Sequence, residues 1–288
     1  MENVKVIAEV GCNHKGDMDI ARKLIDMAAI CGATVVKFQK RHNRELLSPE
    51  EYNRPHPNPV HSYGETYGAH REFLELDAEQ HRELQRHCRE RGLAYACSVW
   101  DLTSAREITA LQPELMKVPS AQNTNTPMLE WLCDNFPGEL HISVGMTSRK
   151  EEEALVALFE RKRRNDSLVL YACTSGYPVD DEDVCLLEIT RLRNTYADRI
   201  KSVGFSGHHR GILPDVLAAH LGAEWIERHF TLDVTWKGTD HSASLEPYEL
   251  AQTVHNIRQL GKLMRGKKQE LLPVEQVQRE KLKYGGGR

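Results

Sequence analysis

The chain has 288 residues, a formal net charge of −4, and a composition that is 40% hydrophobic and 28% charged. This length can bury a sizeable core, the charge provides no global basic field for nucleic acid, and no apolar run approaches the ~20 residues of a membrane helix. The N-terminus lacks the features of a secretory signal, and the seven cysteines include no CxxC pair. We therefore expect a cytoplasmic protein with reduced thiols, binding neither nucleic acid nor membrane.

Short apolar segments typical of strands alternate with helical patterns along most of the chain. The predicted strands cover residues 4–11, 34–39, 93–99, 115–120, 139–145, 167–173, 201–207 and 223–230. The predicted helices cover residues 19–31, 77–91, 103–110, 127–135, 148–163, 180–197, 211–220 and 246–264. Eight strands, each followed by a helix, predict one (β/α)8 domain, a TIM barrel, over residues 1–264. A doubly wound open sheet is the alternative, and the lack of GxGxxG after the first strand counts against it.

Two segments lie outside this repeat. Residues 40–76 form a long loop after the second strand, rich in Pro, His, Arg and Tyr. Connections of this length in compact domains are usually functional or disordered, and the aromatic and histidine content favours an ordered lid or a partner contact. Residues 265–288 are polar, include RGKK and end in YGGGR, so we expect a solvated C-terminal extension.

Polar residues stand at the C-terminal ends of the predicted strands, where the active site of a TIM barrel lies. Residues two apart on a strand share a face, and the pairs at this spacing are Lys37 with Gln39, Ser206 with His208, and Glu227 with His229. The other candidates at or just after strand ends are Glu9, Ser98, Lys117, Ser120, Ser143, Ser175 and Tyr177. Each alone has an ordinary structural explanation, but their convergence on one barrel mouth favours a functional site.

The last two strands suggest a metal site with an anion beside it. Strands 7 and 8 are neighbours in a barrel, so His208 and His229 would place two imidazoles in one mouth. Two imidazoles can bind a divalent transition metal whose other positions stay open for water and substrate. Lys37 and Lys117, with the strand-end serines, would suit a phosphate and a carboxylate together.

The motifs AEVGCNHKGD, VVKFQ, KVPS, SVGM, ACTSGYP, GFSGHH, ERHFT and GTDHSASLEP follow one another through residues 8–247. In this order they resemble the catalytic barrel of the N-acetylneuraminate (sialic acid) synthase family. The resemblance covers nearly the whole chain. It implies a homodimeric transferase that condenses phosphoenolpyruvate (PEP) with a mannose-type aldose. The products would be a nine-carbon 2-keto-3-deoxy sugar acid and phosphate.

The resemblance also implies roles for individual residues. His208 and His229 would hold the divalent metal, Mn2+ in the first place, with Mg2+ or Co2+ as alternatives. The implied PEP contacts are Lys37, Lys117, Ser98, Ser120, Ser143 and Ser206. The implied sugar contacts are Gln39, Ser175, Tyr177, Glu227 and Asp240. Glu9 would lie near the reacting carbons, so the expected catalytic residues are Glu9, Lys37, Lys117 and Glu227.

The sequence departs from the family pattern in three places. Relatives usually carry a C-terminal antifreeze-like domain that donates an arginine to the sugar, and we expect this chain to lack it. The basic segment 40–76 could close the mouth instead, through Arg41, His42, Arg44, Arg54, His61, His70 and Arg71, and would suit a phosphorylated sugar. Ser175 replaces a common asparagine, and Gly207 replaces a common aspartate.

Other functions remain open at this point. A related enzyme on the same barrel could join PEP to a shorter aldose and make a seven- or eight-carbon keto-acid. A non-catalytic relative could bind a sugar acid or a partner as a regulator. A metal-dependent hydrolase would need further metal ligands at other strand ends. The tract ERHFT followed by GTDHSASLEP favours the nine-carbon synthase among these.

Overall fold

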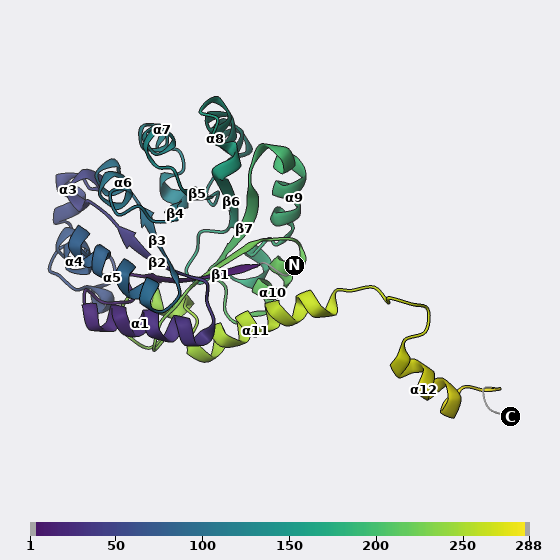
Figure 1. Cartoon of the computed structure of the whole chain (residues 1–288). Coiled ribbons are helices and arrows are strands. Elements are labelled where there is room, and N and C mark those ends of the chain that lie inside the picture. The colour runs from purple at the N-terminus through teal and green to yellow at the C-terminus, as the bar shows by residue number, and fades with distance from the viewer. Residues whose placement is uncertain (1–3, 286–288) are drawn as a thin grey trace.

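The computed structural model describes residues 4–285, in which eight parallel strands pair in sequence order into a closed barrel. The ring closes where the first and last strands pair, Lys5 with Trp225 through Glu9 with His229. This confirms the predicted TIM barrel (Figure 1). The strands are Lys5–Gly11 (β1), Val35–Lys40 (β2), Ala94–Val99 (β3), Leu115–Val118 (β4), Glu139–Ser143 (β5), Leu168–Cys173 (β6), Ser202–Gly207 (β7) and Trp225–His229 (β8).

Each strand is followed by a helix that covers the outside of the barrel. Several helices begin at capping side chains: Asp17 accepts hydrogen bonds from the first turn of α1, and Asp77 and Ser148 form capping boxes at α5 and α8. The covering helices are Met18–Cys31 (α1), Ala78–Glu90 (α5), Leu102–Thr109 (α6), Thr126–Asn135 (α7), Arg149–Arg161 (α8), Leu187–Tyr196 (α9), Leu213–His220 (α10) and Pro247–Leu263 (α11).

The segment after β2 is ordered, as expected, but it is not a plain loop. It contains the short helices Asn43–Leu46 (α2), Pro49–Asn53 (α3) and Tyr67–Leu74 (α4), and a 3-10 turn at Pro59–His61 (η1). The segment is attached to the β8–α11 connection, because Tyr63 Oη donates to the Lys237 carbonyl and Gly238 N–H donates to His61 Nδ1 at 3.1 Å. Both segments therefore stand beside the C-terminal ends of the strands.

The C-terminal extension contains a helix that the polar sequence did not predict. Pro273–Leu282 (α12) stands away from the barrel at the end of an extended segment (Figure 1). The described residues of α12 are largely exposed. The expected solvated extension stays a prediction, and its last residues, 286–288, lie outside the described range. Among residues 4–285 no helix combines the length and the apolar character needed to cross a membrane.

The barrel interior is divided into an apolar floor and a polar layer above it. The floor consists of the buried side chains Ile7, Val35, Ala96, Leu115, Val169, Tyr171 and Trp225. Because side chains on a strand alternate between faces, the residues two positions further along point inward at the next level. The polar strand-end residues therefore lie between this apolar layer and the mouth of the barrel.

Candidate active site

Strand register brings the polar residues of sequence-distant strands side by side. Glu9 is opposite Lys37 on one side and His229 on the other. Ser98 is opposite Lys117, and Ser206 is opposite Glu227. The two members of each predicted pair also line one cavity, which confirms the predicted shared faces: Lys37 with Gln39, Ser206 with His208, and Glu227 with His229.

A cavity of about 260 Å³, called the central cavity below, opens at the C-terminal ends of the strands. Every predicted site residue except Asp240 lines it. The sequence reasoning missed Trp100, Met146 and Cys173. Cys173 is the last residue of β6, two positions after the inward-facing Tyr171, so strand alternation could have identified it. Met146 closes the motif SVGM, which was the available signal for it.

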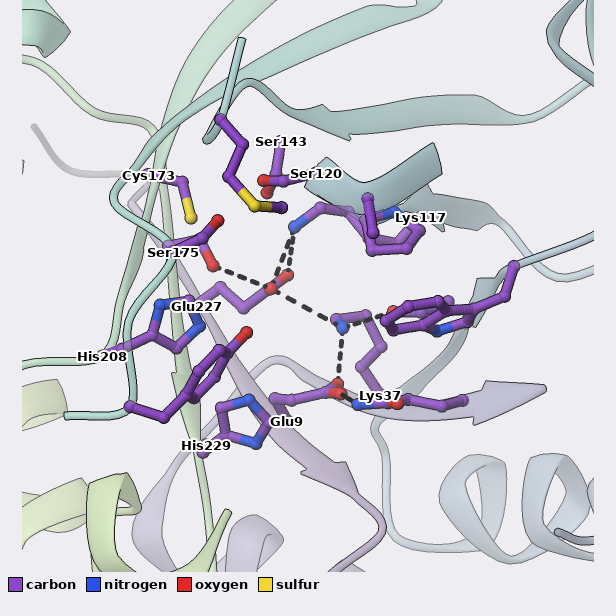
Figure 2. A pocket seen from close by; sticks show the side chains of 18 residues that line it. Glu9, Lys37, Lys117, Ser120, Ser143, Cys173, Ser175, His208, Glu227 and His229 are labelled. Carbon is purple, nitrogen blue, oxygen red and sulfur yellow. Dashed lines mark hydrogen bonds and ion pairs between the residues drawn. The ribbon is translucent and has the colours of Figure 1, made fainter. Parts of the chain in front are cut away.

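A chain of charged contacts crosses the central cavity (Figure 2). Lys37 Nζ lies 2.5 Å from Glu9 Oε2 and 3.6 Å from Glu227 Oε1, and donates to Ser98 Oγ at 2.7 Å. Lys117 Nζ donates to both carboxylate oxygens of Glu227 at 2.9 Å. Ser206 Oγ donates to Glu227 Oε1 at 3.1 Å. These ammonium and carboxylate groups are buried and compensate one another.

Burial and neighbouring charges shift the pKa values of these lysine and glutamate side chains. Burial alone would raise the pKa of Glu227, but Lys117 and Lys37 hold that pKa well below its usual range. Burial would lower the pKa of Lys37, but Glu227 and Glu9 raise it. For Lys117 burial prevails over Glu227, and its pKa is lowered. An anion bound beside Lys117 would favour its charged form.

His208 and His229 meet at the mouth, as predicted, with ring centroids 5.6 Å apart. Their surroundings fit two imidazole ligands of a transition metal. His208 Nδ1 lies 3.1 Å from the Thr174 carbonyl, which fixes the proton on Nδ1 and leaves Nε2 as the donor atom. His229 Nδ1 is buried without a hydrogen-bond partner among the described residues. Burial, reinforced by His229, lowers the pKa of His208 to about 3, so the ring is neutral.

The protein supplies few further ligands at this point. Within residues 4–285 no group of three or more His, Cys, Asp or Glu side chains is placed to hold a metal. β5 does carry a histidine, His141, but it lies buried inside the barrel and contacts Tyr171 Oη at 2.8 Å. A metal at His208 and His229 would keep open positions for water or substrate. The histidine pair therefore does not provide the closed ligand set of a structural site.

Asp240 lies outside the central cavity, in an adjoining space of about 490 Å³ called the outer cavity. Gln39, Trp100, Tyr177 and His229 line both cavities and join them. From the segment 40–76, Arg41, His61, His70 and Arg71 line the outer cavity. His42, Arg44 and Arg54 do not line it, so only part of the predicted basic lid faces the mouth.

Comparisons with known proteins agree with this geometry. A sequence model of the NeuB family matches residues 24–269. N-acetylneuraminate-9-phosphate synthase of Homo sapiens is 39% identical over 96% of this chain and 76% of that protein. N,N'-diacetyllegionaminic acid synthase of Campylobacter jejuni is 36% identical over 92% of this chain and 78% of that protein.

A solved structure extends the likeness to the fold. The N-acetylneuraminic acid (sialic acid) synthetase of Leptospira borgpetersenii, crystallised with citrate, superposes with a TM-score of 0.80 at 29% identity. The match covers 96% of this chain and 90% of that one. Barrel, strand-end residues and sequence likeness lead to the same conclusion: the chain belongs to the NeuB family and is an enzyme of the sialic acid and nonulosonate synthase type.

Proposed function

We propose that this protein catalyses the metal-dependent condensation of PEP with a mannose-type aldose, giving a nine-carbon 2-keto-3-deoxy sugar acid and phosphate. The observation that carries the proposal is the placement of Lys37, Lys117 and the strand-end serines beside the histidine pair in one cavity. The names of the NeuB-family relatives, which include synthases of N-acetylneuraminate 9-phosphate and diacetyllegionaminic acid, support this substrate class. The homodimer and the manganese preference implied by the resemblance stay predictions.

The cavity walls suit PEP, in which the carboxylate and the phosphate are both attached to C2. Lys117 and Lys37 provide ammonium donors, and Ser98, Ser120 and Ser143 surround them with hydroxyls. Glu227 holds both lysines in place before substrate arrives, at 2.9 Å and 3.6 Å. The buried position keeps competing water away and strengthens these contacts.

The reaction balances with one molecule of water. C3 of PEP forms a bond to the aldehyde carbon of the open-chain aldose, and the aldehyde oxygen takes a proton. Water adds to C2, and the tetrahedral carbon expels phosphate by breaking its C–O bond. One proton of the water ends on the new sugar hydroxyl and the other on phosphate, leaving the 2-keto acid.

Residues of the central cavity would guide these steps. Glu9 is the candidate for transferring the proton, because it is fixed by Lys37 at 2.5 Å and by Gln39 Nε2 at 2.7 Å. Gln39 and Tyr177 stand between the two cavities, where the sugar chain would lie. A divalent metal held by His208 and His229 would supply Lewis-acid polarisation of the aldehyde oxygen.

Phosphate release from PEP tests the proposal. Purified protein with Mn2+ should release phosphate only when a mannose-type aldose is present, and a chelator should stop the release. His208→Ala should lose the activity, while His220→Ala, an exposed histidine on α10, should keep it. Absence of release with mannose, N-acetylmannosamine and their 6-phosphates would refute the proposed reaction.

A further inference from the structure

The outer cavity contains two arginines that meet on one aromatic side chain. The guanidinium carbon of Arg41 lies 4.3 Å from the centroid of the Trp100 ring, and that of Arg71 lies 5.7 Å from it. Stacking on an indole orients a guanidinium group. Arg41 Nη1 donates to Cys12 Sγ and Glu75, and Arg41 Nη2 donates to Gln39, so Arg41 offers a ligand mainly its positive charge. Arg71 donates through Nε and Nη1, which leaves its Nη2 for a ligand at the wall of the cavity.

The positive charge of this arginine pair is only partly compensated. Arg71 donates to two neutral acceptors, Tyr67 Oη at 3.1 Å and Asn43 Oδ1 at 3.4 Å, and no carboxylate of the described chain lies within 4.0 Å of it. Burial and the nearby Arg41 lower the pKa of Arg71. Arg41 has Glu75 at 3.4 Å, yet its buried Nε–H has no hydrogen-bond partner in residues 4–285. Such a pair attracts an anion.

Neutral donors complete the wall. His70 Nδ1 accepts from the Tyr63 N–H at 3.1 Å, and His61 Nδ1 accepts from the Gly238 N–H at 3.1 Å. Each ring in its neutral form therefore carries its proton on Nε2, as a hydrogen-bond donor. Burial lowers the pKa of His70 to about 4, which keeps it neutral. Among the described residues that line the outer cavity, Asp240 is the one carboxylate.

The outer cavity is also connected to the reacting centre. Arg41 Nη2 donates to Gln39 Oε1, and Gln39 Nε2 donates to Glu9 Oε1 at 2.7 Å. Gln39, Trp100, Tyr177 and His229 line both spaces. A chain molecule with its aldehyde in the central cavity would therefore extend its far end into the outer cavity.

We propose that the outer cavity is a phosphate-binding subsite, in which Arg71 and Arg41 hold the 6-phosphate of the aldose substrate. This inference rests on the proposed function, because the aldose is placed by its aldehyde in the central cavity. A phosphate monoester carries nearly two negative charges, so it suits the donor groups of Arg71 and the positive charge of Arg41 better than a hydroxyl does. The substrate class is then the 6-phosphorylated mannose-type aldoses.

The test compares kcat/KM for N-acetylmannosamine 6-phosphate and for N-acetylmannosamine, with PEP and Mn2+, by phosphate release corrected for hydrolysis of the sugar phosphate. The wild-type protein should prefer the 6-phosphate at least about tenfold, the effect of one charge-assisted pair. Arg71→Met should reduce this preference by about tenfold or more. Arg71→Lys keeps the positive charge but loses the paired N–H donors of the guanidinium group. It should give an intermediate ratio of kcat/KM between the two aldoses. Circular dichroism checks that each variant is folded.

Arg44→Met is the matched control. Arg44 belongs to the same segment and also stacks on an aromatic ring, Tyr52, at 4.6 Å, but it is exposed and lies outside the outer cavity. Its phosphate preference should equal that of the wild type. Turnover of both aldoses without preference, or a preference that survives Arg71→Met, overturns the subsite and leaves the proposed reaction standing. No phosphate release with either aldose overturns the proposed reaction, and the subsite with it.

Discussion

The ammonium group of Lys117 lies over the face of the Tyr171 ring, 4.0 Å from its centroid. Tyr171 belongs to the apolar floor, and its hydroxyl contacts His141 Nδ1 at 2.8 Å. Gly204 faces it in the register of β6 and β7, and a Cβ at that position would lie 2.6 Å from the ring. The missing side chain at 204 therefore makes room for the aromatic face that supports Lys117.

We predict that Tyr171→Leu weakens PEP binding, whereas Tyr171→Phe retains it. Loss of the aromatic face removes a desolvated cation–π contact worth about 2 kcal/mol, which corresponds to roughly a 30-fold rise in KM for PEP. Phe keeps the face and should stay within about threefold of the wild type. Steady-state kinetics of both variants measure the difference. Equal losses in the two variants would mean that the hydroxyl bond to His141, and not the ring, is what matters.

Most of the fold follows from apolar runs of strand length alternating with capped helical patterns. β1 and α1, for example, begin and end within one residue of their predicted bounds. Strand parity likewise predicted the shared cavity of Lys37, Glu227 and His208. Both patterns are local in the sequence. The rule that the active site of a TIM barrel lies at the C-terminal ends of its strands then locates the site.

What the sequence left out depends on contacts between distant segments. The position of Asp240 is set by a connection without periodicity, so its assignment to the outer cavity required coordinates. The stacking of Arg41 on Trp100 joins two different βα loops, and no spacing rule predicts it. Helices α2 and α3 have only four and five residues, too few for a periodic signal. Helix α12 has ten residues but buries none of them, so it carries no core-facing apolar stripe that a sequence pattern could reveal.

A buried histidine makes stability depend on pH. Burial lowers the pKa of His81 from 6.5 to about 3, and its Nδ1 contacts Tyr95 Oη at 2.7 Å. Between pH 6.5 and about pH 3, His81 is protonated in the unfolded chain but neutral in the folded chain. The free energy of unfolding therefore falls as the pH drops below 6.5. From pH 7 to pH 5 this one group should remove about 2 kcal/mol from the free energy of unfolding.

Urea unfolding at pH 7 and pH 5 measures this loss. His81→Leu should be less stable than the wild type at pH 7, because it leaves the Tyr95 hydroxyl without its partner. The same variant should show a loss between the two pH values that is about 2 kcal/mol smaller. His255→Gln, at an exposed position on α11, is the control and should change the pH dependence little. An unchanged pH dependence in His81→Leu would contradict the assignment.

Gly207 stands directly before the proposed metal ligand His208. A Cβ at Gly207 would lie 2.6 Å from His209 Cε1 and 2.8 Å from Phe205 Cε1. His209 cannot easily move away, because Arg228 holds its Nε2 and its carbonyl oxygen at 2.7 Å each. In this chain the His209 ring therefore occupies the space that a side chain at 207 would need.

We predict that Gly207→Ala lowers the free energy of unfolding by about 1–3 kcal/mol through overpacking. Removing the opposing ring should relieve the clash, so Gly207→Ala combined with His209→Ala should cost less than the sum of the two single changes. A double-mutant cycle from urea unfolding should give a coupling of about 0.5–3 kcal/mol. Gly266→Ala, which meets no atom within 4 Å, is the control and should fall within about 0.5 kcal/mol of the wild type. Additive losses in the cycle would show that His209 is not what excludes a side chain at 207.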